Sequence, residues 1–179
     1  MIDHSDSSGI ISEFVYTTEL LKWVSIMRQF EITTQYQPLN IGPPNSPTTK
    51  STVDIGECHG VDKNNIKGFI LFEKVIMPKI REHFSKDTKL NFAHYLKSTT
   101  PVKMHVDVWD KPPYISCLIP VSVDDDISLC NKSSTIVDNV EHIWKHGDLI
   151  WWDSTLPHCS NDFTLTNTSK QSIVIHTYV

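Results

Sequence analysis

The sequence predicts a mainly β protein with N-terminal helices (α+β), in which short strands build a jelly-roll sandwich or barrel. Two observations carry this prediction. Helical spacing of apolar residues is confined to the part before residue 88, and short β-type runs separated by Asp, Asn, Gly, Pro and Ser fill the part from residue 89 onward. Helices that come before the strands are expected to pack outside one sheet.

Chain length, net charge and hydropathy limit the number of domains and the classes of partner. A chain of 179 residues is expected to form a single domain, 1–179, with a helical and loop part at 1–88 and a β core at 89–179. The net charge of −5 gives no basic field for phosphate backbones, so a nucleic-acid partner is unlikely. The sequence has no apolar run long enough to span a bilayer, and residues 1–14 lack Lys and Arg, so no membrane association and a cytoplasmic location are expected.

The distribution of cysteines also favours a cytoplasmic location. The four cysteines are widely scattered and form no Cys-x-x-Cys pair, which favours free buried thiols over a zinc knuckle or a thioredoxin-like motif. Free thiols agree with a reducing compartment.

Two helices and a long loop are predicted in the first half. Residues 17–30 place apolar side chains at helical spacing after a pair of threonines that can cap the helix start. Residues 38–65 are rich in Pro, Gly, Ser, Thr and Asn and predict a long loop. Residues 66–84 return to helical spacing, and Pro78 is expected to kink or restart that helix.

The second half predicts a series of short strands, each bounded by turn-forming residues. The expected strands are residues 90–96, 102–108, 114–121, 134–137, 140–144, 148–152, 163–165 and 172–179. So many short strands at close spacing favour the jelly-roll arrangement.

Three His-x-Asp triplets occur, so context has to choose among them. The triplet at 4–6 stands in a polar N-terminal tail, where nothing would hold ligand geometry. The triplet at 146–148 contains a glycine just before an apolar run and is typical of a turn that begins a strand. Its His146 and Asp148 are therefore interpreted as structural.

The middle pair, His105 and Asp107, alternates with apolar residues, which places both polar side chains on one face of a strand. A third ligand has to come from a distant strand, and His158 follows the predicted strand 148–152. Two imidazoles and one carboxylate leave three positions of an octahedron open, as in ferrous oxygenases. Downstream, Lys170 and Ser172 share a strand face and are expected to grip a carboxylate by charge and by hydrogen bond.

With these residues the sequence resembles the 2-oxoglutarate and iron(II)-dependent oxygenase superfamily, whose pattern is His-x-Asp, a distal His, then Arg or Lys with Ser two positions later. The local runs at 104–107 and 147–152, the latter leading to Leu156-Pro157-His158, look like that family's metal-binding strands. The resemblance covers residues 89–179, about half the chain. It implies a double-stranded β-helix (jelly-roll, cupin-like) core.

The resemblance also implies a site and a reaction. His105, Asp107 and His158 would bind Fe(II), and Lys170 and Ser172 would hold the distal carboxylate of 2-oxoglutarate. The implied activity is that of a dioxygenase, an oxidoreductase that uses molecular oxygen and releases succinate and CO2 while oxidising a C–H bond. Hydroxylation is favoured, because Asp107 stands where halogenating relatives have a small residue.

One departure from the pattern is that many members place Arg where Lys170 stands, and Lys cannot make the bidentate fork. A second polar anchor is therefore needed, and Tyr95, Asn91 and Tyr114 are candidates. Trp109, just after Asp107, is a candidate substrate contact. The primary substrate is unidentified, with a small molecule and a peptidyl side chain such as proline both compatible, and the oligomeric state is unknown.

Two other functions fit parts of the pattern. A non-catalytic cupin-like module that binds a metal or ligand would have the same fold, and only release of succinate distinguishes it from an oxygenase. A zinc hydrolase would also use two His and one carboxylate, but it leaves Lys170 and Ser172 without a task.

Overall fold

The structure is a computed structural model, and it describes residues 7–31, 37–38, 50–54, 72–98, 102–107, 115–161 and 169–179. Its helical elements are α1 Thr17–Glu31, the π-helical turn η3 Phe72–Ile76, α3 Met77–His83 and the 3-10 helix η4 Ile127–Lys132. Its strands are β1 Ser8–Ile11, β2 Gln37–Pro38, β3 Lys50–Asp54, β4 Lys89–Ser98, β5 Ile115–Val123, β6 Ser134–Val137, β7 Val140–Ile143, β8 Leu149–Asp153, β9 His158–Ser160 and β10 Lys170–Tyr178.

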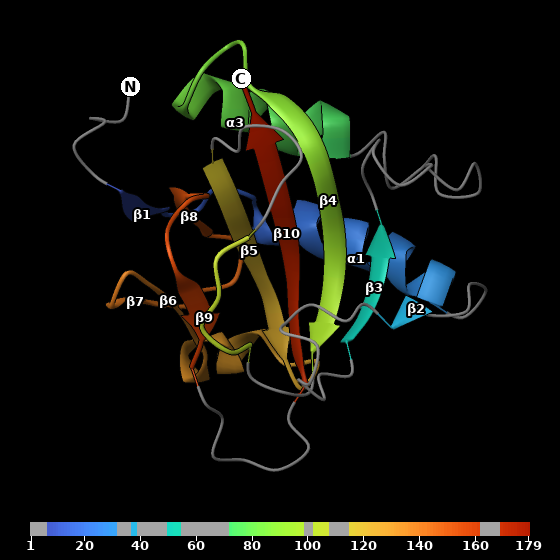
Figure 1. Cartoon of the computed structure of the whole chain (residues 1–179). Helices are drawn as coiled ribbons and strands as arrows, with labels where there is room; N and C mark the ends of the chain where they lie inside the picture. The colour runs from blue at the N-terminus through green and yellow to red at the C-terminus, as the bar shows by residue number, and fades with distance from the viewer. Residues whose placement is uncertain are drawn as a thin grey trace.

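The strands form two antiparallel sheets. The larger sheet has the order β1-β8-β5-β10-β4-β3-β2, and the smaller one has the order β7-β6-β9. Figure 1 shows β10 in the middle of the larger sheet, between β5 and β4. This arrangement confirms the predicted jelly-roll core and explains why the second half of the chain reads as strands.

Alternation along β10 separates two environments, because successive strand residues point to opposite faces. Ile173 and Ile175 belong to the apolar core under the helices, whereas Val174 packs into a second core. Lys170, Ser172 and His176 share the face of Val174. The centre of the larger sheet therefore carries three polar residues on the side that faces the smaller sheet.

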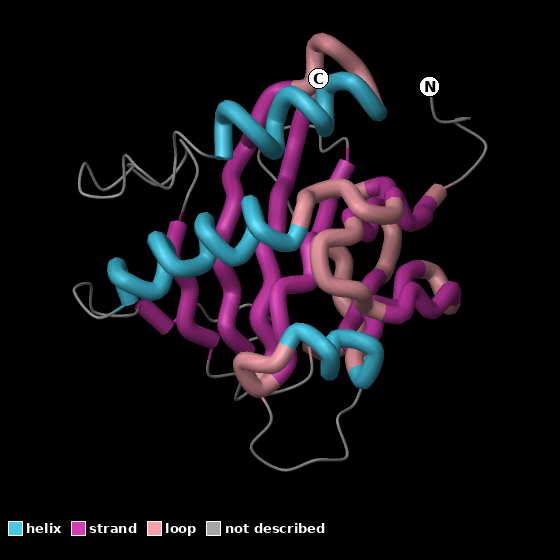
Figure 2. The backbone as a smooth tube through the Cα atoms, turned by 180° about the vertical axis from the view of Figure 1, so that it is seen from behind, coloured by secondary structure: helices cyan, strands magenta, loops and turns pink. Residues whose placement is uncertain are grey.

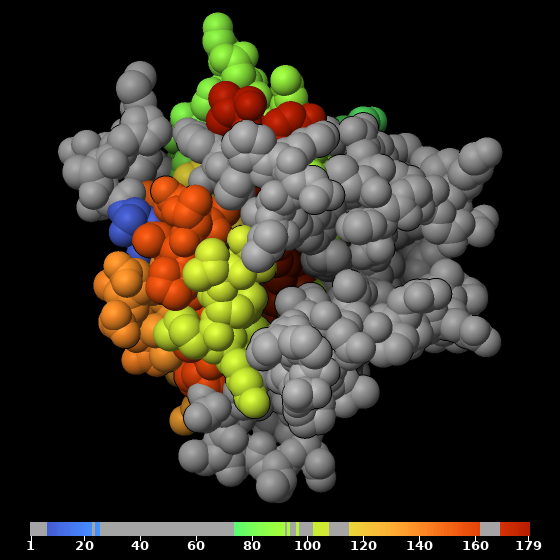
Figure 3. Space-filling model, in the orientation of Figure 1, coloured from blue at the N-terminus to red at the C-terminus, as the bar shows by residue number. Residues whose placement is uncertain are grey.

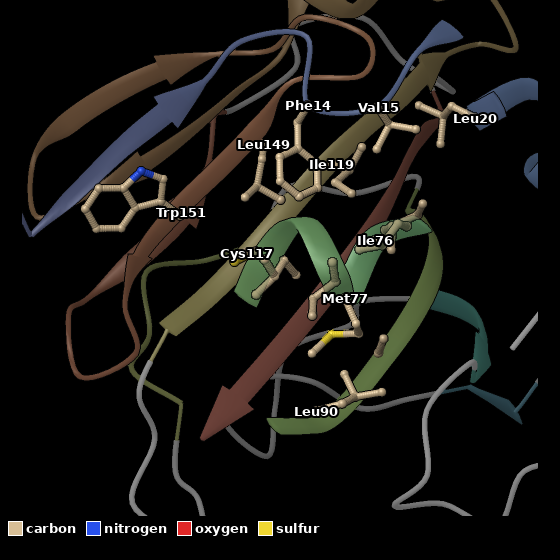
Figure 4. Close-up of a cluster of buried hydrophobic side chains, with 14 of the residues drawn as sticks. Phe14, Val15, Leu20, Ile76, Met77, Leu90, Cys117, Ile119, Leu149 and Trp151 are labelled. Carbon is tan, nitrogen blue, oxygen red and sulfur yellow. The ribbon is translucent and has the colours of Figure 1, made fainter. Parts of the chain in front are cut away.

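The outer face of the larger sheet is covered by α1 and α3, which Figure 2 shows from behind. Leu20 and Val24 of α1 and Met77 and Ile80 of α3 are buried there. Figure 4 shows Leu20 and Met77 in one cluster with strand residues such as Ile119. The prediction that the helices pack outside one sheet is confirmed.

The second core fills the space between the two sheets. Its buried residues come from both sheets and their connections: Leu118, Cys130, Val137, Trp144, Ile150 and Trp152. Cys130 here and Cys117 in the outer core are free thiols, and burial raises the pKa of both. Among the described residues, polar positions of β10 and of its neighbour β5 interrupt this apolar inner face.

The N-terminal segment fastens onto the edge of the larger sheet, a feature that the sequence did not predict. β1 pairs with β8, and the amide of Val15 donates to the carbonyl of Gly147 at 2.9 Å. Gly147 has φ +82, and a Cβ there would lie 2.5 Å from the Val15 carbonyl oxygen. A glycine is therefore required at this turn.

In the first half, the helix expected at 66–84 is confirmed in its described part. The π-helical turn η3 is followed by α3, which restarts the helix with Pro78 in its first turn. Proline fits there because the first amides of a helix have no internal partner. The loop expected at 38–65 contains β3 and the end of β2, since pairing with β4 overrides its composition.

In the second half, residues 102–107 are not the regular strand that was predicted. They make an isolated bridge at His105 and hydrogen bonds at Val102 instead. The predicted strand at 163–165 lies outside the described residues. No helix in the described part of the chain is both long and apolar enough to cross a membrane.

Candidate metal centre

Two histidines meet across an antiparallel bridge. The amide of His105 donates to the carbonyl of His158 at 3.0 Å, and the amide of His158 donates back at 2.8 Å. Val102 and Ser160 add two more hydrogen bonds between the same segments. The two imidazole rings consequently lie side by side, with their centroids 4.4 Å apart and their planes tilted by 51°.

Asp107 completes the cluster. One carboxylate oxygen, Oδ1, lies 3.5 Å from Nε2 of His105, and the other, Oδ2, lies 3.5 Å from Nε2 of His158. One ligand atom from each of the three residues lies within 4.8 Å of the others. The structure thus brings together the three side chains that the sequence selected as a metal site.

The orientation of both rings is fixed by backbone carbonyls. Nδ1 of His105 lies 2.8 Å from the Lys103 oxygen, and Nδ1 of His158 lies 3.1 Å from the Leu156 oxygen. A carbonyl only accepts, so in each neutral ring the proton is on Nδ1 and the lone pair is on Nε2. Metal-binding histidines are typically held in this way.

Burial raises the pKa of Asp107, but a hydrogen bond from His105 and the charges of His176, His158 and His105 outweigh it and lower the pKa overall. Among the described residues nothing donates a hydrogen bond to Oδ2, although this atom is buried. An ionised carboxylate beside two imidazole lone pairs fits a divalent transition metal.

The other His-x-Asp triplets have different surroundings. Nδ1 of His146 donates to the carbonyl of Val121 at 2.6 Å, and Oδ1 of Asp148 accepts from the amide of Glu13 at 2.9 Å. These bonds tie the turn before β8 to β5 and to the N-terminal segment. The triplet at 4–6 lies outside the described residues.

A fourth histidine, His176, lies beside the cluster and was missed by the sequence analysis. Its Nδ1 is 3.8 Å from Oδ2 of Asp107 and 2.9 Å from the hydroxyl oxygen of Ser116. The signal that could have found it is the alternation of β10, which places His176 on the same face as Lys170 and Ser172.

Lys170 is buried, with 4% of its surface exposed, on the inner face of β10. Its ammonium group donates to the backbone oxygen and to Oδ1 of Asn161, both at 3.1 Å, and lies 5.9 Å from the centre of the Trp144 ring. Ser172, two residues further, is also buried. The two residues expected to grip a carboxylate therefore share one face.

Asn161 is the other residue that the sequence analysis missed. Its Oδ1 also accepts from the amide of Ser134 at 3.1 Å, so the donating backbone amide fixes the side-chain oxygen toward Lys170. Asn161 follows His158 by three positions. One short segment thus carries both a candidate metal ligand and the acceptor that orients Lys170.

The other residues predicted from the sequence, as a second carboxylate anchor or a substrate contact, receive less support from the structure. Strand register sets Tyr95 opposite Ile173 and Leu96 opposite Ser172. Because Ile173 belongs to the outer core, the register separates position 95 from the face that carries Ser172. Trp109 and Tyr114 lie outside the described residues, whereas Asn91 is half-buried on β4.

The metal centre opens to the surface along residues 102–107. Figure 3 shows this segment in yellow-green beside a hollow at whose floor β10 is visible in dark red. Met104 and Val106, which flank His105 in the sequence, are 49% and 46% exposed.

Neither a protein-family model nor a curated protein matches the sequence. Solved structures do match. A Pseudomonas putida prolyl-4-hydroxylase has a TM-score of 0.61 at 11% identity, with 97% of this chain and 93% of that chain covered. A prolyl hydroxylase from Trichoplax adhaerens, solved with a hypoxia inducible factor oxygen degradation domain peptide fragment, has a TM-score of 0.65 at 13% identity, covering 98% and 84%.

A third similar structure is the epimerase SnoN from nogalamycin biosynthesis, in complex with Fe3+, alpha ketoglutarate and nogalamycin RO. It has a TM-score of 0.67 at 9% identity and covers 97% of this chain and 79% of that chain. Identities this low show the fold. This chain therefore has the fold of the 2-oxoglutarate and iron(II)-dependent oxygenases, which confirms at the level of the fold the resemblance found in its sequence.

Proposed function

We propose that this chain is a non-haem Fe(II)- and 2-oxoglutarate-dependent dioxygenase. The observation that carries the proposal is the cluster of His105, Asp107 and His158, whose ligand atoms lie within 4.8 Å of one another in a fold that such enzymes use. Two histidines and one carboxylate with open positions are the ligand set of this class.

His105, Asp107 and His158 would hold the metal through the two Nε2 atoms and the carboxylate. The carbonyls of Lys103 and Leu156 keep both rings in the tautomer that ligation requires. Bound Fe(II) would supply, with 2-oxoglutarate and molecular oxygen, the oxidation that releases succinate and CO2 and attacks a C–H bond.

Lys170 and Ser172 would bind the distal carboxylate of 2-oxoglutarate. A buried ammonium group gives a charge-assisted hydrogen bond to a carboxylate, and the hydroxyl of Ser172 on the same face supplies a second donor. Asn161 and the Trp144 ring hold the ammonium in place. This support offsets the missing fork of an arginine.

The apolar residues between the two sheets would keep water from the reacting groups. Val174 packs between the positions of Ser172 and His176, and Trp152 packs against the ring of His158 at a centroid distance of 4.9 Å. Dry surroundings strengthen the electrostatic contacts of a bound carboxylate and limit side reactions.

The primary substrate in this proposal is a small molecule or a peptidyl side chain, and the favoured reaction is hydroxylation. The similar structures include a prolyl hydroxylase in complex with a peptide fragment and the epimerase SnoN in complex with nogalamycin RO, so both substrate classes occur on this fold.

Succinate release tests the proposal against a non-catalytic cupin-like module. The chain is incubated aerobically with Fe(II), ascorbate and 2-oxoglutarate, alone and with metabolite or proline-peptide libraries, and succinate is measured. An oxygenase gives succinate that rises with one class of substrate and disappears in Asp107→Ala. Absence of succinate above the Asp107→Ala background throughout would favour the binding module.

A further inference from the structure

His176 stands next to the candidate metal ligands without being one of the cluster of three. It is buried, and its Nδ1 lies 3.8 Å from Oδ2 of Asp107. That oxygen is the buried carboxylate atom for which the described residues provide no hydrogen bond. The two groups are therefore complementary, and a small rotation of either side chain would join them.

Two buried hydroxyl groups hold the His176 ring. Nδ1 lies 2.9 Å from the oxygen of Ser116, and the Ser116 oxygen lies 3.0 Å from that of Ser154. Both serines are at most 1% exposed. Ser116 pairs directly with His176 across β5 and β10, so the ring is anchored at the centre of the larger sheet.

The direction of this hydrogen-bond chain follows from electrostatics. A lone pair on Nδ1 would face the negatively charged Oδ2 of Asp107 and repel it, whereas a proton on Nδ1 is attracted to it. With Nδ1 protonated, His176 donates to Ser116, and the Ser116 hydroxyl donates to Ser154. This single N–H is accepted by Ser116 at 2.9 Å, and its dipole also attracts Oδ2 of Asp107 at 3.8 Å.

We propose that His176 is a positioning residue for Asp107. Its Nδ1–H holds one carboxylate oxygen, so that Asp107 presents the other oxygen to the metal, and Ser116 and Ser154 hold the ring in that orientation. This inference rests on the proposed function, because it assigns a partner to a residue of the metal centre. Hydrogen bonds to a ligating carboxylate orient it and tune the metal site.

A purely structural role for His176 predicts a different behaviour. A buried histidine satisfied by Ser116 would affect folding stability without affecting the metal. The positioning role instead predicts a change in metal affinity and in the electronic spectrum of the bound ion. His142 provides a matched control, since it is also a buried histidine bonded to a serine hydroxyl, that of Ser8, but lies on the edge strand β7.

Cobalt(II) is a suitable probe because its visible spectrum reports the number and geometry of its ligands. Wild type, His176→Leu, His176→Asn, Ser116→Ala and His142→Leu are titrated with Co(II) without oxygen, and thermal unfolding of each metal-free protein is recorded. His176→Leu should weaken Co(II) binding by about 10- to 100-fold and change the visible bands. His142→Leu should leave the Co(II) affinity and the visible bands unchanged.

Asparagine tests the hydrogen bond itself, because its side-chain nitrogen can take the place of Nδ1. His176→Asn should restore affinity to within about threefold of wild type, and Ser116→Ala should fall between the two His176 variants. If His176→Leu does not fold, the Co(II) affinities of Ser116→Ala and His176→Asn still test the positioning role. Wild-type affinity in Ser116→Ala together with a large loss in His176→Asn would then overturn the inference.

The outcomes separate this inference from the proposed function. If wild type binds Co(II) and His176→Leu binds it with the same affinity and spectrum, the positioning role is wrong and the metal centre stands. If wild type binds no Co(II) at all, the proposed function fails and the positioning role fails with it.

Discussion

The ammonium nitrogen of Lys170 lies 3.1 Å from Oδ1 of Asn161, and that oxygen also accepts from the amide of Ser134 at 3.1 Å. The lysine is thus held by a neutral acceptor whose orientation is fixed by the backbone. Because this acceptor is neutral, Asn161 orients the ammonium group without adding a negative charge beside it.

Replacing this neutral acceptor by a charged one should therefore block the anchor. Asn161→Asp keeps an oxygen in place but adds a carboxylate that pairs with Lys170 and competes with 2-oxoglutarate. We expect 2-oxoglutarate to bind about 10- to 100-fold more weakly, in line with about 1.5–3 kcal/mol for a hydrogen bond to a charged group. Calorimetric titration measures this, and an unchanged dissociation constant would show that Lys170 is not the anchor.

Removing the lysine itself tests the same contact from the other side. Lys170→Ala should raise the Michaelis constant for 2-oxoglutarate by about one to two decades and leave metal affinity unchanged. Lys170→Arg keeps the charge but overfills the site, so activity should be weakened and not lost. Lys145→Ala, at an exposed position, is the control. An unaltered Michaelis constant in Lys170→Ala would exclude this residue as the anchor.

The two histidine–aspartate pairs should respond differently to alanine. His105→Ala, Asp107→Ala and His158→Ala should each abolish turnover while the domain stays folded. Asp148→Ala should instead lower unfolding free energy by about 1–3 kcal/mol, because the Glu13 amide loses its acceptor. Metal titration measures the loss of the metal site, and chemical denaturation measures the loss of stability. Loss of metal binding in His146→Ala would mean that the wrong pair was selected.

Acid should expose the electrostatics of Asp107. Its pKa is lowered in the folded protein, so its ionised form stabilises the metal-free fold above the ordinary value of 3.8, and this contribution is lost as the pH falls through the lowered pKa. Between pH 5 and pH 3, wild type should lose more unfolding free energy than Asp107→Asn. Urea denaturation at both pH values measures this, and parallel losses would contradict the assigned pKa direction.

Much of the fold could be predicted because local signals sufficed. Short runs of strand-forming residues bounded by turn-forming residues marked β5, β6, β8 and β10, and helical spacing marked α1. β1 was missed because four residues without clear alternation are defined only by pairing with β8, which is distant in sequence. The irregular path of residues 102–107 follows from the same kind of distant pairing, here with β9.

In the candidate site too, some residues could be predicted from the local sequence and others only from contacts between distant segments. His105, Asp107 and His158 were found because their residue types and order carry a chemical pattern. His176 and Asn161 carry no pattern of their own, and only the packing of β10 against β5 and the turn after β9 gives them partners. Cross-strand neighbours of this kind are set by register, which a single sequence does not display.

The binding of 2-oxoglutarate with and without metal tests the central claim most directly. Calorimetry without oxygen would compare the metal-free protein, the protein loaded with Fe(II), and His158→Ala with Fe(II) present. The account predicts markedly tighter binding in the Fe(II)-loaded wild type alone, together with the weak visible band of a metal-chelated keto acid. Equal affinity in all three samples, with no such band, would contradict it.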